Sequence, residues 1–377
     1  MRTISKLAAI NLGVLLSLFA LLEVGLRITG IERPAFYRYD QTKGFAHRAN
    51  VQGWWTQEGK AWVAINNEGF RDENHSEKSR PGVIRGAVLG DSFSEAFQVN
   101  IDKSWWKQLE NKINKSTDCK LTKKYQNGLE LMNFGVGAYG TGQALLTWRQ
   151  NVRKKQPDFV LLAMFLGNDI EDNTPRNRQD RPVFKINKEN NLEIDNSFRK
   201  STNSQFRQSW LGHRLDWFVT HSRIAQLINS AKNNAAQFEF SPNNRNTKKP
   251  SAPPPASPAS AEGWAVTKAL LKQMNREVSA AGSQLIVVSL SSPEQVWLKK
   301  EQRPKNQFLR EQHLTEILSE LKVPYVALAP TMQLEADALK MHLHGFPGQQ
   351  LGIGHWNENG HQLAAELLKR KLCIGLF

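Results

Sequence analysis

The chain of 377 residues is long enough for one large domain or two modest ones, and 40% of its residues are hydrophobic, which allows a sizeable buried core. Its formal net charge of +15 favours acidic partners such as anionic lipid headgroups, acidic polysaccharide or nucleic acid. Nucleic-acid binding is not predicted, because no zinc-ligand spacing, RNA-binding aromatic motif or basic zipper accompanies the scattered cations.

The N-terminus carries the clearest targeting signal. No charged residue lies between Leu7 and Leu22, and an apolar helix of about 20 residues is long enough to cross the hydrocarbon core of a bilayer. Glu23 and Arg27 follow one helical turn apart, where they can neutralise each other. Because the segment lacks a small-x-small cleavage site, we predict that residues 1–30 are an uncleaved anchor, with a cleaved signal peptide as the alternative.

Residues 31–80 are predicted to form an extension that packs on the core, with one strand and a turn within "AWVAINNEGFRDE". From residue 81 onward, apolar strand signals alternate with helical patterns. The predicted strands cover residues 83–90, 129–137, 159–169, 283–292 and 324–329. The predicted helices cover residues 105–114, 141–156, 262–281, 307–321 and 357–372. Such alternation is typical of a parallel sheet covered by helices on both faces.

A polar stretch at about 171–260 interrupts this pattern. It contains a cationic run from Arg199 to Arg223, which we interpret as a solvated face, and it ends in "NNRNTKKPSAPPPASPAS". Proline, serine and alanine cannot bury enough apolar area to fold, so this last segment is predicted to be a flexible loop or linker.

The two cysteines, Cys119 and Cys373, belong to no CxxC pair, so neither a metal site nor a redox site is predicted from them. They could pair in an oxidising compartment, but two isolated cysteines are more often simply small apolar residues. The sequence leaves both alternatives open and favours the unpaired one.

Three of the predicted strands end in polar groups, and ligands bind at the carboxyl ends of strands in such a sheet. The first ends in "GDSFS" with Ser92, the second in "NFGVGAYG", and the third in "GND" with Asn168. The segment "GHWNENGH", with His355, lies just before the last helix. A hydroxyl nucleophile, a base with a pKa near neutrality and donors for a developing oxyanion are what acyl transfer requires.

These four segments, in this order, resemble the four blocks of the SGNH (GDSL) hydrolase superfamily, over roughly residues 83–170 and 283–372. The apolar N-terminus, "INNEGFRD" and "NFGVGAYGTGQ" resemble a membrane-anchored bacterial branch of it. The resemblance implies a flavodoxin-like three-layer α/β sandwich with a five-stranded parallel sheet over residues 81–377, besides the N-terminal transmembrane helix. It implies no cofactor and no metal.

Carried over residue by residue, the resemblance makes Ser92 the nucleophile, Asn168 a side-chain oxyanion donor and His355 the general base, with His361 as the alternative base. The backbone N–H of Ser92 would be a further oxyanion donor. The backbone donor of the second block falls at Ala138, where the family usually has glycine; the N–H survives, although alanine tolerates fewer backbone angles. The neighbouring Asp91 and Asp169 are interpreted as structural.

The expected acid is missing. The family commonly has an aspartate three residues before its histidine, and this chain has Gly352 there. Either a Ser–His dyad operates, with a backbone carbonyl or a distant acid orienting the imidazole, or activity is weakened. We therefore expect an activity profile that follows an unraised histidine pKa of about 6.5, and a faster Gly352→Asp variant. A pKa of His355 well above about 7 would instead indicate a carboxylate paired with it. Such an acid would be expected within residues 171–260 or near Asp337.

The leading interpretation is an extracytoplasmic serine esterase or deacylase that removes an O-acyl group, such as acetyl, from a small molecule, polysaccharide or lipid. One alternative is an O-acyltransferase acting on cell-surface polysaccharide, in which a sugar hydroxyl replaces water. The other is a catalytically silent binding module on the same fold, which the missing acid suggests. The catalytic residues alone do not separate the first two.

Overall fold

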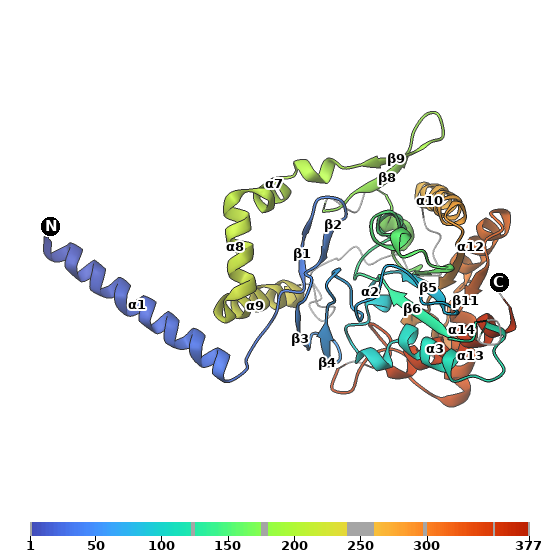
Figure 1. Ribbon diagram of the computed structural model, residues 1–377, viewed down its shortest axis with the longest axis horizontal. Helices are drawn as coiled ribbons and strands as arrows, with labels where there is room; N and C mark the ends of the chain where they lie inside the picture. The colour runs from blue at the N-terminus through green and yellow to red at the C-terminus, as the bar shows by residue number, and fades with distance from the viewer. Residues whose placement is uncertain are drawn as a thin grey trace.

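Five apolar segments pair as the strands of one parallel sheet, in the order β11–β10–β7–β5–β6 (Figure 1). They are β5 (Ile84–Leu89), β6 (Leu129–Asn133), β7 (Phe159–Met164), β10 (Gln284–Ser289) and β11 (Tyr325–Ala327). Numbered along the chain this order is 2-1-3-4-5, the flavodoxin-like arrangement. The computed structural model describes residues 2–121, 125–174, 180–239, 260–296, 300–349 and 351–375.

Helices cover both faces of the sheet because its central strands are apolar on both sides. In β7, Val160 and Leu162 belong to one hydrophobic core, whereas Leu161 and Ala163 belong to the other. The first core is completed by α5 (Thr141–Thr147), α10 (Ala261–Ala280) and α12 (Leu309–Glu320). The second is completed by α3 (Trp105–Asn114), α13 (Ala329–Leu339) and α14 (Glu358–Ile374). The predicted three-layer α/β sandwich is confirmed.

All five predicted strands end earlier than expected, two of them by four residues or more. The segment 129–137 is extended only to Asn133, whose side-chain Oδ1 accepts the N–H of Gly135 at 3.0 Å and so turns the chain out of the sheet. The segment 159–169 is extended only to Met164. The residues left over form the loops at the carboxyl edge of the sheet.

The predicted helix 141–156 is helical as far as Lys155 but changes type along its length. After α5 it continues as a π-helical segment, Trp148–Val152, and a 3-10 turn, Arg153–Lys155. Trp148 and Val152 are both buried in the first core. The apolar spacing therefore predicted the buried face, but not the wider backbone turn.

The N-terminal helix α1 (Arg2–Ile28) extends away from the sheet (Figure 1). In the described part of the chain it is the helix long and apolar enough to cross a membrane, with a mean hydropathy of 2.1 over Ala9–Ile28 and 6% of that span buried. Arg27 and Glu23 form the predicted ion pair at 2.8 Å. Whether the helix is retained as an anchor stays a prediction.

The segment predicted to carry one strand contains two antiparallel hairpins. These are β1 (Tyr37–Asp40) with β2 (Gly44–His47), and β3 (Gln52–Trp55) with β4 (Ala61–Ala64). Phe36, Val63 and Ile65 from this extension form a small core with Phe97 of the main domain. The strands are four residues long and partly exposed, so their alternation is too short to be read from sequence. The domain bounds at residues 30 and 80 stay a prediction.

The polar stretch after residue 171 is more structured than the sequence indicated. It forms β8 (Val183–Ile186), β9 (Leu192–Asp195), α7 (Thr202–Gln208), α8 (Trp210–His221) and α9 (Arg223–Glu239). Ser201 and Ser209 cap α7 and α8 by accepting backbone N–H groups, a signal already visible in the sequence. The Pro-rich segment, apart from Ser260, lies outside the described residues.

Cys119 and Cys373 form a disulfide, which corrects the preference for unpaired thiols. Cys373 lies in the last turn of α14, and Cys119 follows α3. The two helices pack against each other, and this packing brings together residues 254 positions apart in the chain. The sequence separation itself carries no sign of that proximity.

We predict that Cys373→Ser lowers the free energy of unfolding by about 2–5 kcal/mol, because the disulfide restricts a long loop of the unfolded chain. The measurement is thermal unfolding of the full chain in detergent, where Tm should fall by several degrees. The Tm of Cys119→Ser and that of the reduced wild type should both equal the Tm of Cys373→Ser. An unchanged Tm in all three would show that the bond contributes nothing to stability.

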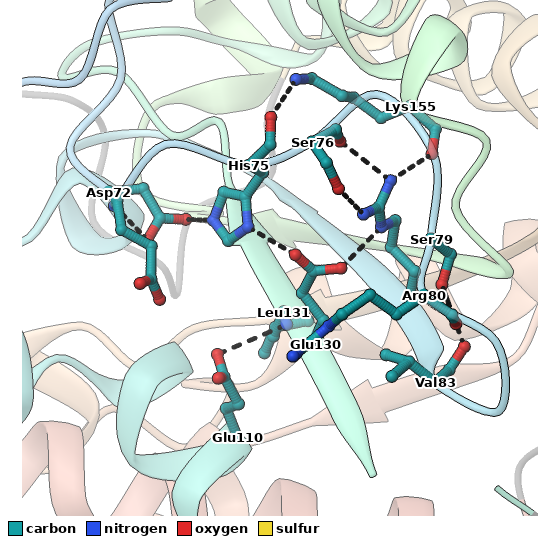
Figure 2. A network of polar contacts seen from close by, with 12 residues as sticks. Asp72, His75, Ser76, Ser79, Arg80, Val83, Glu110, Glu130, Leu131 and Lys155 are labelled. Carbon is teal, nitrogen blue, oxygen red and sulfur yellow. Dashed lines mark hydrogen bonds and ion pairs between the residues drawn. The ribbon is translucent and has the colours of Figure 1, made fainter. Parts of the chain in front are cut away.

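A second long-range constraint is a network of charges beneath β5 and β6. His75 lies between two carboxylates, with Nε2 3.0 Å from Asp72 Oδ2 and Nδ1 2.8 Å from Glu130 Oε1 (Figure 2). Glu130 Oε2 also accepts a hydrogen bond from Arg85 Nε at 2.8 Å. Burial lowers the pKa of His75, but the two carboxylates outweigh it and raise that pKa to about 9. The extension is thereby fastened to β5 and to the edge strand β6.

Because the folded-state pKa of His75 is raised, its stabilising contribution is complete below pH 6.5 and is lost as the pH rises through about 9. We predict that the free energy of unfolding falls between these pH values and that His75→Gln removes part of this fall. The measurement is denaturant unfolding as a function of pH. His313→Gln, which changes an exposed histidine, is the control and should keep the wild-type slope; equal slopes in all three proteins would contradict the prediction.

Candidate active site

A cavity of about 760 Å³ opens where the loops after β5, β6 and β7 meet. Ser92, Ala138, Asn168 and His355 all line it. The first three follow three neighbouring parallel strands, whose carboxyl ends lie at one edge of the sheet. The four residues singled out in the sequence are therefore brought to one place.

Ser92 is the first residue of the short helix α2 (Ser92–Glu95). Asp91 caps this helix by accepting the N–H of Phe93 at 3.0 Å. A Cβ at Gly90 would lie 2.5 Å from Ser94 Oγ and 3.0 Å from the Ala163 carbonyl oxygen, so only glycine lets the turn lie this close to β7. The strand–glycine–aspartate sequence thus fixes where the serine hydroxyl emerges.

His355 lies directly beside this serine. Its Nε2 is 2.8 Å from Ser92 Oγ. The ring of Phe93 packs 5.1 Å from the imidazole and 5.1 Å from the indole of Trp356, centroid to centroid. The aromatic contacts restrict the imidazole to the orientation in which Nε2 meets the hydroxyl.

The other imidazole nitrogen meets a carboxylate that the sequence did not identify. His355 Nδ1 is 2.5 Å from Glu58 Oε2, and the backbone N–H of His355 donates to Glu58 Oε1 at 2.7 Å. Of the two orienting groups expected, a backbone carbonyl or an acid distant in the chain, the structure has the acid. Asp337, near which an acid was sought, forms an ion pair with Arg303, and Glu58 lies in the extension rather than in residues 171–260.

Glu58 reaches His355 from the loop that joins β3 to β4, and two glycines make this approach possible. A Cβ at Gly59 would lie 2.2 Å from the Gln98 carbonyl oxygen, and one at Gly354 would lie 2.1 Å from Glu58 Oε1. Both glycines have positive φ, +66° and +79°. The only sequence signal for Glu58 is an acidic residue before a glycine in a short loop, 297 positions from its partner.

The Gly352→Asp variant is no longer expected to be faster. Gly352 has a φ of +83°, in the left-handed region that disfavours a side chain. Its N–H donates to the His344 carbonyl oxygen at 2.9 Å, which fixes this conformation. An aspartate there would strain the loop, and the position it would fill beside His355 is held by Glu58.

The charge of Glu58 sets the protonation of the pair. Burial by itself lowers the pKa of His355, but the hydrogen bond and charge of Glu58, with weaker contributions from Asp91 and Glu95, raise that pKa above its ordinary value. Burial raises the pKa of Glu58, and His355 outweighs this, so the pKa of Glu58 lies below its usual range. An unraised histidine pKa is therefore no longer expected.

The loop after β6 is held by a buried carboxylate. Gly137 donates its N–H to Glu95 Oε1 at 2.7 Å, and the same oxygen lies 2.6 Å from both Tyr37 Oη and His47 Nε2. The next residue, Ala138, has a φ of 61° despite its side chain, and its carbonyl oxygen accepts a hydrogen bond from Arg181. Among the described residues the N–H of Ala138 has no hydrogen-bond partner, so it is available to a ligand.

Asn168 lies on the third side of the cavity. Its Nδ2 donates to Asp172 Oδ2 at 2.9 Å, which fixes the amide and leaves the second Nδ2 hydrogen without a partner among the described residues. Its Oδ1 is buried without a hydrogen bond in that same part of the chain. An amide held in this way is suited to donate to an anionic oxygen in the cavity.

The remaining polar residues of the blocks make structural contacts. His361 Nδ1 accepts the N–H of Trp105 at 3.2 Å, and burial lowers its pKa to about 3. Asp169 Oδ2 accepts the N–H of Phe165 at 3.0 Å. Burial raises the pKa of Asp91 to about 7, and burial together with Asp91 raises that of Asp169. These contacts favour His355 over His361 as the base.

Asp72, Glu73 and His75 are the described residues whose ligand atoms lie near enough together, within 4.8 Å of one another, to suit a metal ion. Both ring nitrogens of His75 already contact carboxylates, and its raised pKa of about 9 keeps it protonated at neutral pH. A protonated imidazole has no lone pair for a metal. We therefore interpret the cluster as the structural network of Figure 2.

No protein-family model matches the chain, and no curated protein matches it. Among solved structures, an acetyl xylan esterase overlaps 77% of this chain and 100% of its own, with 10% identity and a TM-score of 0.40. One from Geobacillus stearothermophilus overlaps 78% and 96%, with 11% identity and a TM-score of 0.39. A candidate lipolytic protein of the G-D-S-L family from Desulfitobacterium hafniense overlaps 76% and 98%, with 11% identity and a TM-score of 0.35. Likenesses at this level assign no activity.

We predict that the pKa of His355, measured by NMR titration, lies above about 6.5 in the wild type and falls in Glu58→Gln. Replacing the carboxylate by an amide removes the charge that stabilises the imidazolium, whereas the burial that destabilises it remains. Asp337→Asn is the control, because it removes a carboxylate that pairs elsewhere, and it should leave the pKa of His355 unchanged. Equal values in wild type and Glu58→Gln would disprove the coupling.

Proposed function

We propose that the protein is a serine esterase or deacylase of the SGNH type that hydrolyses an O-acyl ester. The observation that carries the proposal is the continuous hydrogen-bonded chain Ser92–His355–Glu58, with contacts of 2.8 Å and 2.5 Å, at the wall of a cavity. Nucleophile, base and acid in hydrogen-bond contact are the arrangement that activates a serine hydroxyl.

In the proposed reaction, Ser92 Oγ attacks the ester carbonyl carbon while His355 Nε2 takes the hydroxyl proton. The imidazolium that forms is stabilised by Glu58, which acts through His355 and is a positioning residue. The tetrahedral intermediate collapses, the bond to the alcohol oxygen breaks, and His355 gives that oxygen the proton. A water molecule then attacks the acyl-serine, with His355 as base, and releases the carboxylic acid and the free serine.

Three donors are proposed to stabilise the negative oxygen of the tetrahedral intermediate. They are the N–H groups of Ser92 and Ala138 and the Nδ2 group of Asn168, all from residues that line the cavity. The left-handed backbone of Ala138 is fixed on one side by Arg181 and on the other by the bond from Gly137 to Glu95. Donors held before the reaction begins need no reorganisation in the transition state.

The cavity wall supports an acyl ester with polar groups near its ester bond. Phe45, Trp55 and Phe165 provide apolar and aromatic surface, whereas Gln98 and Arg181 provide buried polar groups. Such a mixture suits a small acyl group on a hydroxylated carrier. The hydroxylated carrier can be a polysaccharide or a lipid.

The disulfide and the apolar α1 support a location outside the cytoplasm. Disulfides persist in oxidising compartments, and the pair Cys119–Cys373 is formed in this chain. With α1 uncleaved, the protein would be a single-pass membrane protein whose catalytic domain lies on the extracytoplasmic side.

We predict that Ser92→Ala lowers hydrolysis of a short-chain aryl ester by at least about 10³-fold, because the nucleophile is lost. Glu58→Gln should lower kcat by up to about 10⁴-fold and move the acid limb of the pH–rate profile to lower pH. Ser94→Ala removes a hydroxyl from the same short helix and serves as the matched control, with activity near that of the wild type.

Near-wild-type turnover by a folded Ser92→Ala protein would refute the nucleophile assignment. Failure of a fluorophosphonate to label Ser92 would instead indicate a catalytically silent binding module. A labelled serine that transfers its acyl group to a sugar acceptor faster than to water would indicate an acyltransferase.

A further inference from the structure

Helix α8 presents a row of large apolar side chains to the outside. Trp210, Leu211, Leu215, Trp217 and Phe218 are 71%, 51%, 46%, 59% and 40% exposed, and we call these five residues the α8 face. They recur at the three-, four- and seven-residue spacings of one side of a helix. The cationic run from Arg199 to Arg223 was expected to form a solvated face, but an exposed apolar patch of this kind marks an interaction surface.

The inner side of α8 is fixed to the rest of the molecule. Arg48, which follows β2, forms a two-pronged ion pair with Asp216. A Cβ at Gly212 would lie 2.0 Å from the Phe206 carbonyl oxygen, so α7 and α8 meet in a tight corner. Because its inner side is held in this way, the α8 face points away from the catalytic domain.

The same corner of the molecule is joined to α1. Glu23 accepts hydrogen bonds from Ser222 Oγ at 2.9 Å and from the N–H groups of Arg223 and Ile224 at 2.9 and 3.1 Å, which caps the start of α9. Arg27 Nη2 donates to the His221 carbonyl oxygen at 2.6 Å. Figure 1 shows the C-terminal part of α1 near α9 and the C-terminal end of α8.

One contact sets the depth of α8 relative to the apolar helix. The ring of Phe19 stacks on that of Phe218, with centroids 6.1 Å apart. Phe19 lies within the apolar span Ala9–Ile28, four residues before Glu23, the first charged residue towards the end of that span, which is about 6 Å along a helix. If α1 crosses a bilayer, Phe218 is therefore held at the level of the lipid and not of bulk water.

The composition of α8 suits the boundary between headgroups and acyl chains. Trp210 and Trp217 have the amphipathic rings that are enriched at that boundary. The Arg214 guanidinium lies 5.4 Å from the Trp210 ring centroid, and a long cationic side chain there can reach anionic headgroups. The overall charge of +15 also favours binding to an anionic membrane.

We propose that α8 is an interfacial helix whose apolar face lies in the surface of the anionic bilayer that α1 crosses. This inference rests on the proposal that α1 is a retained anchor, and it does not depend on the esterase activity. Lipid is the occupant that the Phe19–Phe218 contact favours, because it makes the α8 face continuous with the apolar surface of α1. The two helices together would hold the catalytic domain in one orientation on the membrane.

The test places an environment-sensitive fluorophore on Leu211→Cys or Leu215→Cys in the full chain, reconstituted into phosphatidylcholine–phosphatidylglycerol vesicles. The native cysteines are joined in the disulfide, so labelling is specific under non-reducing conditions. The matched control is Leu334→Cys, a leucine that is 69% exposed on α13, and Figure 1 shows this helix on the far side of the domain from α1. We expect spin-labelled lipid to quench positions 211 and 215 several-fold more than 334, and aqueous iodide to do the reverse.

Quenching of positions 211 and 215 by iodide to the same extent as 334 would overturn the proposal. Protection of those positions from both quenchers would also overturn it, because it would mean that protein covers the α8 face, as in a second copy of the chain. Release of the chain by alkaline carbonate with a new N-terminus near Gly30 would remove the anchor and this inference with it. None of these outcomes alters the Ser92→Ala test, so failure of the esterase proposal is recognised separately.

Discussion

The contact between Glu58 and His355 joins the first part of the chain to the last, and the chemistry proposed for the cavity depends on it. One carboxylate binds both the backbone N–H and the ring Nδ1 of the histidine, so it fixes the loop and the imidazole together. Glycines 59 and 354 are needed because a Cβ at either would collide with the partner segment. The extension is consequently part of the site, and not a spacer between α1 and the sheet.

A second carboxylate, this one buried, joins the extension to the other side of the cavity. Glu95 binds Tyr37 and His47 of the β1–β2 hairpin and the N–H of Gly137 in the loop after β6. A buried charge is tolerated only when its hydrogen bonds are satisfied, so these partners must assemble together. One hairpin of the extension thus supplies the acid, and the other supports the loop that carries a proposed oxyanion donor.

The same extension also connects the cavity to the proposed membrane surface. Arg48 directly follows β2 and pairs with Asp216 on α8, so the hairpin that contacts Glu95 is also bound to the helix whose apolar face is exposed. If α8 lies in the bilayer surface, the height and orientation of the cavity above the membrane are fixed through this ion pair. An ester on a membrane-associated or surface-bound carrier would then meet the cavity in a restricted orientation.

Local patterns in the sequence determined the sheet, most of its helices and the positions of Ser92, Asn168 and His355. Apolar periodicity and glycine-bounded turns act over only a few residues, so they can be recognised in the sequence. Parallel strands then bring their carboxyl ends, and the residues that follow them, to one edge of the sheet. The other three strands of the two hairpins and the strands of the insertion were missed because they span only four residues and are partly exposed. The acid, the disulfide and the depth of α8 were decided by tertiary structure alone. Glu58 and His355 are 297 positions apart and the two cysteines 254, while Phe19 and Phe218 meet only where α1 contacts α8. Contacts between such distant residues follow from how whole elements pack, and no local spacing in the sequence encodes them.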